Sequence, residues 1–184
     1  MEKAFEEKLN LQQTGVLFVN SINKVRDEQG NSIIHGGAGA KYKITSKKSL
    51  LASGSLCKIK LCKNVDDALD KGKSEYFAIK RFNKLTLRKH KQYLRRPDGM
   101  GMLIWTQLDA VRKEIDIMKL VNHNNCIQLY EVIEDVPKKD DEGNDISDEE
   151  LSEKIYLVME LARHKEVMTW NLNDYKFVPN PCLI

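Results

Sequence analysis

The sequence predicts an α+β domain whose elements follow the order strand, strand, strand, helix, strand, strand. Two observations support this order. Short runs of β-branched, aliphatic and aromatic residues are separated by polar or glycine-containing turns, and one longer segment carries apolar residues at helical spacing. Hydrophobic residues make up 41% of the 184-residue chain and charged residues 31%, so a core and a solvated surface are both expected.

The first two strands are expected around Leu50–Leu51 and over 57–61, and a Gly/Ser turn at 53–55 joins them. The third strand is expected over 76–82, where the run YFAIKRF is rich in aromatic and aliphatic residues. The last two strands are expected over 127–134 and 155–161. These five segments are the predicted sheet.

The helix is expected over 106–121. Its apolar residues recur every three or four positions and therefore lie on one face: Leu108, Val111, Ile115 and Met118. Thr106, followed three positions later by Asp109, fits a capping box at the start of this helix. The apolar face predicts that the helix covers the sheet.

Outside these elements, residues 1–40 are expected to form a poorly ordered arm, and residues 41–165 the folded domain. Two insertions are expected within it, a basic segment over 87–105 punctuated by Gly and Pro and an acidic segment over 137–153. Residues 166–184 are expected to be the truncated start of a C-terminal lobe, or a tail. The basic insertion has no interleaved aromatic residues, so a solvated face is favoured over a nucleic-acid site.

Composition limits the partners and the cellular location that we expect for the protein. A net charge of +3 does not indicate a polyanionic partner. No apolar run reaches about 18 residues, so no membrane span is expected. The four cysteines form no CxxC pair, which favours reduced thiols. We therefore expect a cytoplasmic protein, with the nucleus as the alternative.

Lys80 at the end of the third strand and Glu114 on the predicted helix are the first candidate site residues. Glu114 lies at the edge of the apolar face of the helix, so it could hold the ammonium group of Lys80 against the sheet. Such a pair can position nucleotide phosphates. The alternative is an exposed lysine at a strand end. The preceding turn, with Gly54, could bring backbone amides close to phosphates, although it contains a single glycine.

Four landmarks in this order resemble the first half of a eukaryotic protein kinase domain. They are A-x-G-x-x-C-x-I over 52–59, F-A-I-K over 77–80, R-K-E-I over 112–115 and I-Y-L-V-M-E over 155–160. F-A-I-K is similar to the V-A-I-K strand of kinases. The resemblance implies an N-terminal lobe, with a five-stranded antiparallel sheet and one packed helix (helix C), and no C-terminal helical lobe. The R-P insertion at 96–97 resembles that of calcium/calmodulin-dependent protein kinase kinases.

The resemblance implies a role for each candidate residue. Lys80, held by Glu114, would contact the α- and β-phosphates of ATP, beneath a hairpin in which Ala52 and Cys57 replace two glycines of the family pattern. Further positions follow from the adenine pocket of the family. Ile59 and Ala78 would cover adenine, Met159 would close the back of the pocket, and Glu160 and Ala162 would bond adenine through their backbone.

The H-R-D and D-F-G segments, which supply the catalytic aspartate and the Mg²⁺ ligands of kinases, do not occur in this sequence. The resemblance therefore implies a serine/threonine kinase lobe that binds ATP and is inactive as this chain alone, with no catalytic or metal-ligating residue of its own. Its protein substrate could be another kinase, and calmodulin would bind only through a C-terminal segment outside this sequence. The alternative is a non-catalytic, kinase-like module that binds a protein.

Overall fold

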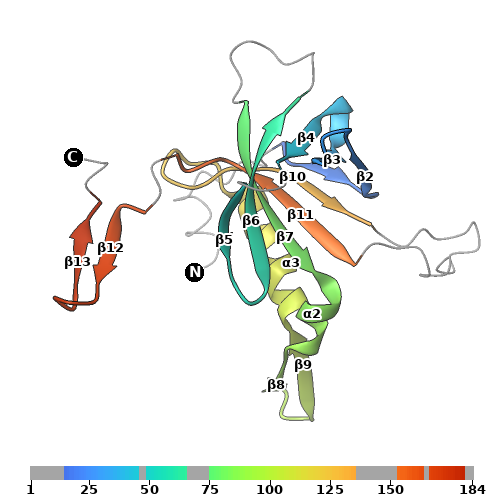
Figure 1. The fold of residues 1–184 in the computed structure, drawn as a ribbon. Helices are drawn as coiled ribbons and strands as arrows, with labels where there is room; N and C mark the ends of the chain where they lie inside the picture. The colour runs from blue at the N-terminus through green and yellow to red at the C-terminus, as the bar shows by residue number, and fades with distance from the viewer. Residues whose placement is uncertain (1–14, 46–48, 66–74, 136–152, 164–165, 181–184) are drawn as a thin grey trace, which may run out of the picture.

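The structure is a computed structural model that describes residues 15–45, 49–65, 75–135, 153–163 and 166–180. Strands dominate it, and one long helix packs against the central strands (Figure 1). The elements are β1 Leu17–Val19, β2 Asn23–Arg26, β3 Ser32–His35, η1 Gly37–Gly39, β4 Lys41–Ile44, β5 Leu50–Ser53, β6 Cys57–Asn64, β7 Tyr76–Asn83, α2 Lys84–Lys89, β8 Lys91–Arg95, β9 Met102–Thr106, α3 Gln107–Leu120, β10 Leu129–Glu134, β11 Lys154–Met159, β12 Met168–Asn171 and β13 Lys176–Pro179.

The main sheet has nine strands within the described part of the chain. Eight of them follow the order β1-β10-β11-β7-β6-β4-β3-β2, and β5 pairs with β6 off this path. β1 runs parallel to β10, and the other pairs are antiparallel. The sheet is curled, so that β2, β3 and β4 stand beside the central strands rather than continuing their plane (Figure 1).

Alternation along the central strands divides the core into two layers. Leu157 and Ile155 of β11 face α3 and pack with its buried residues Leu108, Val111 and Ile115. Tyr156 and Val158 point the other way and pack with Ile34 and Tyr42 of the curled β3–β4 pair, because successive strand residues face opposite sides of a sheet. We call these two sides the helix face and the outer face.

The predicted helix is confirmed. α3 begins after Thr106, whose hydroxyl accepts from the Asp109 N–H while the Asp109 carboxylate accepts from the Thr106 N–H, so both arms of the capping box are present. Leu108, Val111 and Ile115 are buried, and Met118 is partly buried against the same core. Helical spacing therefore identified the packed face correctly.

The α+β class agrees with the structure, and each of the five predicted strands is present, as β5, β6, β7, β10 and β11. The count of five strands is wrong for this structure, since β1 to β4 also belong to the sheet. Part of the segment 1–40, which was expected to be a poorly ordered arm, is also regular structure in the described residues. From residue 15 onward, this segment forms β1, β2, β3 and η1, because long-range pairing with β10 and β4 stabilises strands too short to show a period.

The expected insertion at 87–105 is partly regular structure. Leu87 is fully buried in the core of the helix face, and β8 pairs with β9 to form a hairpin that extends away from the sheet (Figure 1). Residues 168–179, placed in the tail, form the hairpin β12–β13. The acidic segment lies outside the described residues except for Glu153. The boundaries at 41 and 165 stay a prediction. No helix of the described residues is long and apolar enough to cross a membrane.

Candidate functional site

Lys80 and Glu114 form an ion pair on the helix face. The Nζ of Lys80 lies 2.7 Å from Oε1 of Glu114, and the side chains are 19% and 43% exposed, respectively. The Phe82 ring, two residues along the same strand and therefore on the same face, lies 5.0 Å from the ammonium group. The lysine is thus held by a carboxylate and an aromatic face, yet the pair remains accessible to a ligand. Phe82 was not selected from the sequence, although its spacing of two from Lys80 was a usable signal.

Strand register places the apolar candidates around this lysine. Ile59 of β6 and Leu157 of β11 lie directly opposite Lys80 on its two neighbouring strands. Ala78 lies opposite Met159 on β11, and both are buried. Because residues directly opposite one another share a face, Ile59, Ala78 and Met159 line the helix face beside Lys80.

The hairpin between β5 and β6 closes through a tight turn. The Gly54 N–H donates to the carbonyl oxygen of Cys57 at 2.9 Å, and Ala52 lies opposite Ile59. A Cβ placed on Gly54 would meet only that carbonyl, at 3.9 Å, and the residue does not adopt a positive φ. Neither steric crowding nor a left-handed backbone therefore requires glycine here. The contribution of Gly54 is that no side chain covers the backbone at the tip of the hairpin.

Glu160 and Ala162 follow directly after β11. The Glu160 N–H donates to the carbonyl oxygen of Gln128 at 2.9 Å, and its carboxylate accepts from the Gln128 N–H at 3.2 Å. These two bonds hold the start of this segment against the residue that precedes β10. Ala162 is exposed and lies outside regular structure.

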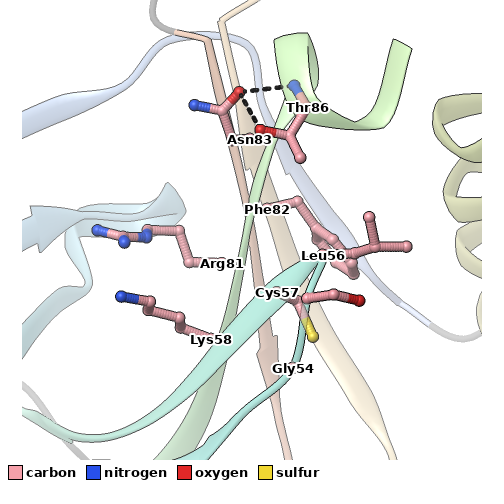
Figure 2. Close-up of a pocket in the computed structure, with 9 residues that line it drawn as sticks. Gly54, Leu56, Cys57, Lys58, Arg81, Phe82, Asn83 and Thr86 are labelled. Carbon is pink, nitrogen blue, oxygen red and sulfur yellow. Dashed lines mark hydrogen bonds between the residues drawn. The ribbon is translucent and has the colours of Figure 1, made fainter. Parts of the chain in front are cut away.

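A hollow lies beside the hairpin tip, on strands β6 and β7 and the start of α2 (Figure 2). Gly54 and Cys57 line it, and so do Leu56, Phe82 and Thr86. The amide oxygen of Asn83 accepts from the Thr86 N–H at 3.0 Å and caps α2 at its edge. In Figure 2, Lys58 and Arg81 extend together to the side opposite Leu56 and Phe82. The hollow thus joins the hairpin to Phe82, which in turn touches Lys80.

The structure therefore brings eight of the ten candidate residues to two neighbouring places and sets two beyond the end of β11. The eight are the hairpin residues Ala52, Gly54 and Cys57 and the helix-face residues Ile59, Ala78, Lys80, Glu114 and Met159. No group of three or more His, Cys, Asp or Glu side chains that could hold a metal ion occurs among the residues that the structure describes. Lys80 supplies a cation on the helix face, and Lys58 and Arg81 also line the hollow at the hairpin tip. Together with the apolar surface and the backbone turn, these cations suit an anionic ligand with an apolar ring.

No protein-family model matches the sequence. Over 121 residues, or 66% of its length, the chain is 35% identical to a probable serine/threonine-protein kinase of Dictyostelium discoideum. The matched stretch is 13% of that protein, so the chain spans only a small part of this curated relative. This similarity, together with a curled sheet covered by one main helix, identifies a kinase-like region in the chain.

Proposed function

We propose that residues 41–165 are the ATP-binding small lobe of a serine/threonine protein kinase. One observation carries the proposal: Lys80 and Glu114 meet at 2.7 Å on the helix face, beneath the β5–β6 hairpin, within a chain that has a kinase-like region. A lysine on the third kinase strand paired with a glutamate of the covering helix is the arrangement that positions the phosphates of ATP.

In this proposal, the nucleotide lies along the helix face. Lys80 contacts the α- and β-phosphates, and Glu114 keeps its ammonium group directed at them. Ile59 and Ala78 cover the adenine ring, and Met159 limits the depth of the pocket. The carbonyl of Glu160 accepts from the adenine amino group, and the amide of Ala162 donates to the ring.

The hairpin is the part in which this chain departs from the kinase pattern. Cys57 is half-buried and carries a Cβ where kinases place a glycine, which restricts the approach of the backbone to the phosphates. Binding of ATP is therefore proposed to rely on Lys80 and the apolar surface more than on the hairpin amides. Weaker affinity than that of a glycine-rich loop is expected.

Phosphoryl transfer to a protein serine or threonine needs a catalytic aspartate and Mg²⁺ ligands, and the H-R-D and D-F-G segments that carry them in kinases are not among these 184 residues. In our proposal this chain supplies nucleotide binding, and transfer depends on those segments. The R-P insertion at 96–97 resembles that of kinases that activate other kinases. It lies at the tip of the β8–β9 hairpin. That tip is proposed as a contact for a substrate kinase.

Binding of MgADP and MgATP to the 184-residue chain, measured by titration calorimetry, tests the proposal. Lys80→Met should weaken binding by about tenfold or more, because it removes a charge-assisted bond to phosphate. Glu114→Gln should weaken it less. Lys91→Met is the control, since Lys91 lies on the exposed strand β8 and does not line the hollow at the hairpin tip.

Equal affinities of the wild type, Lys80→Met and Lys91→Met would overturn the proposed site. No saturable binding of either nucleotide to a folded wild-type chain would also overturn it and would favour the non-catalytic, protein-binding alternative. Far-UV circular dichroism of each variant separates loss of binding from loss of fold.

A further inference from the structure

A second hollow lies on the outer face of the sheet, on the side opposite Lys80, and shares Arg81 with the hollow at the hairpin tip. We call it the basic hollow, and its polar lining residues are Lys24, Ser32, Lys60, Arg81 and Tyr156. Strand alternation explains its position. Arg81 follows Lys80 on β7 and Lys60 follows Ile59 on β6, so each points away from the helix face. Lys24 comes from β2, which the curl of the sheet brings over the central strands.

The three cations of the basic hollow have no acidic partner in the described residues. Carboxylates neutralise other lysines of the curled region, as in the pairs Lys43–Asp27 and Lys63–Glu75. Across residues 15–45, 49–65, 75–135, 153–163 and 166–180, by contrast, no carboxylate lies within ion-pair distance of Lys24, Lys60 or Arg81. Among the residues that the structure describes, no acidic side chain lines the hollow.

Several positive charges lie close together around this hollow. The pKa of Lys24 is lowered, first by burial and then by the positive charges of Lys154, Arg81, Arg26 and Lys60. Asp135 is the acidic group near enough to influence Tyr156, and its carboxylate accepts from the Ile22 N–H. Mutual repulsion of this kind costs stability unless an anion offsets it.

Tyr156 adds a hydrogen-bond donor without a partner. It is 1% exposed, and its hydroxyl is buried without a hydrogen bond in the described part of the structure. Buried polar atoms without a partner are rare, so each points to a missing ligand or to strain. Burial raises the pKa of Tyr156, which keeps the phenol protonated and able to donate. Tyr156 lies directly opposite Arg81 on β11, so the hydroxyl and the guanidinium share the outer face.

We propose that the basic hollow binds a phosphate group, with Lys24, Lys60, Arg81 and the Tyr156 hydroxyl as its donors. A dianionic phosphate matches three cations and one neutral donor better than a carboxylate, which carries one charge. The ligand chemistry is therefore a dianionic phosphate, either free inorganic phosphate or the monoester of a phosphorylated side chain. This site lies on the face opposite Lys80, so it stands whether or not the chain binds ATP.

The test is a titration of the 184-residue chain, followed by heteronuclear NMR, with inorganic phosphate in one arm and a short phosphoserine peptide in the other. Lys60→Met and Tyr156→Phe should each weaken binding about fivefold or more, because each removes one donor. Lys58→Met is the control, since Lys58 lies two residues from Lys60 on the same strand and does not line the hollow. MgADP affinity should not change in Lys60→Met, which keeps this site distinct from the nucleotide site.

Similar affinity for both probes would support a site for free phosphate, and tighter binding of the phosphopeptide would support a site for a phosphorylated segment. The proposal is overturned if neither probe binds saturably to the folded wild type. It is also overturned if Lys60→Met and Tyr156→Phe both bind as the wild type and the Lys58→Met control do, because the cations would then be a solvent-screened cluster only. Tyr156→Phe keeps the ring and its packing, so its unfolding free energy should not fall and loss of binding would not reflect misfolding.

Discussion

The carboxylate of Glu131, in the middle of β10, accepts a hydrogen bond from the backbone N–H of Gly37, which follows β3. The two residues are 94 positions apart in the sequence, and Glu131 is 1% exposed. The contact fixes the η1 turn against the outer face of the sheet, next to Tyr42. A buried carboxylate thus links the N-terminal strands to the central sheet, which explains why this segment is part of the fold rather than an arm.

Gly36→Ala should destabilise the protein by about 1–3 kcal/mol, the range for overpacking a filled site. A Cβ at Gly36 would overlap the Glu131 carboxylate and lie 2.7 Å from Cε2 of Tyr42, and both neighbours are held by surrounding structure. The free energy of unfolding in urea measures the effect. Gly54→Ala is the control, because its Cβ would meet a single atom at 3.9 Å. Equal stability of the two variants would contradict the close packing of η1.

Stability should also depend on pH through Glu131. Burial raises the pKa of this carboxyl above its ordinary value of 4.5, and the Gly37 N–H offsets only part of that effect. The folded state therefore holds this proton more tightly than the unfolded state, so the contribution of Glu131 to stability is greatest below pH 4.5 and declines as pH rises through its folded-state pKa. Urea unfolding of the wild type and Glu131→Gln from about pH 4 to about pH 7.5 should show the wild type losing stability relative to the variant. A constant difference would contradict the raised pKa.

Prediction from sequence succeeded where a pattern is local. The stripe from Leu108 to Met118 and the Thr106 cap identified α3, and the resemblance of F-A-I-K to a kinase strand directed attention to Lys80. Glu114 was then found because a helix face can be read from spacing. The roles of these residues toward ATP stay a prediction, since they depend on a ligand.

What sequence reasoning missed depends on pairing between distant segments. β1 has three residues, and its place beside β10 comes from the register of Leu17 with Glu131. The basic hollow was missed for the same reason, because Lys24, Lys60 and Arg81 come from three strands and meet only when the sheet curls. Alternation of Lys58 and Lys60 with Ile59 and Leu61 was the available signal for a basic strand face.

Lys84 should contribute to stability through a buried ion pair with Glu134. Its side chain is 7% exposed, its Nζ lies 3.0 Å from Oε1 of Glu134, and it donates to the carbonyl oxygen of Asp135 at 2.7 Å. Among the described residues, Lys84→Met would leave the carboxylate with Arg112 alone, at 3.7 Å, and the change should cost about 2–4 kcal/mol. The control is Lys91→Met on exposed β8, which should change stability by less than about 0.5 kcal/mol.

A double-mutant cycle with Glu134→Gln separates this pair from general packing. We expect a coupling energy of about 1–3 kcal/mol from urea unfolding of the two single variants and the double variant. Additive effects would show that the two side chains stabilise the protein independently, contrary to the direct contact. Because Glu134 lies on β10 and Lys84 begins α2, the coupling reports how firmly α2 is held to the sheet.

The cysteines should differ widely in reactivity. Burial raises the pKa of Cys62 to about 12, and its thiol donates to the carbonyl oxygen of Phe77 at 3.5 Å, whereas Cys126 is exposed. Since the thiolate is the reacting form, iodoacetamide should modify Cys62 at least about a hundredfold more slowly than Cys126 in the native chain. Timed alkylation with peptide mass spectrometry gives both rates, and in urea they should converge.

Half-buried Cys57 should react with iodoacetamide at an intermediate rate. If the proposed nucleotide site is correct, saturating MgADP should slow the modification of Cys57 and leave that of Cys126 unchanged. Equal native rates for Cys62 and Cys126 would contradict the burial of Cys62, and a Cys57 rate insensitive to bound nucleotide would place the nucleotide away from the β5–β6 hairpin.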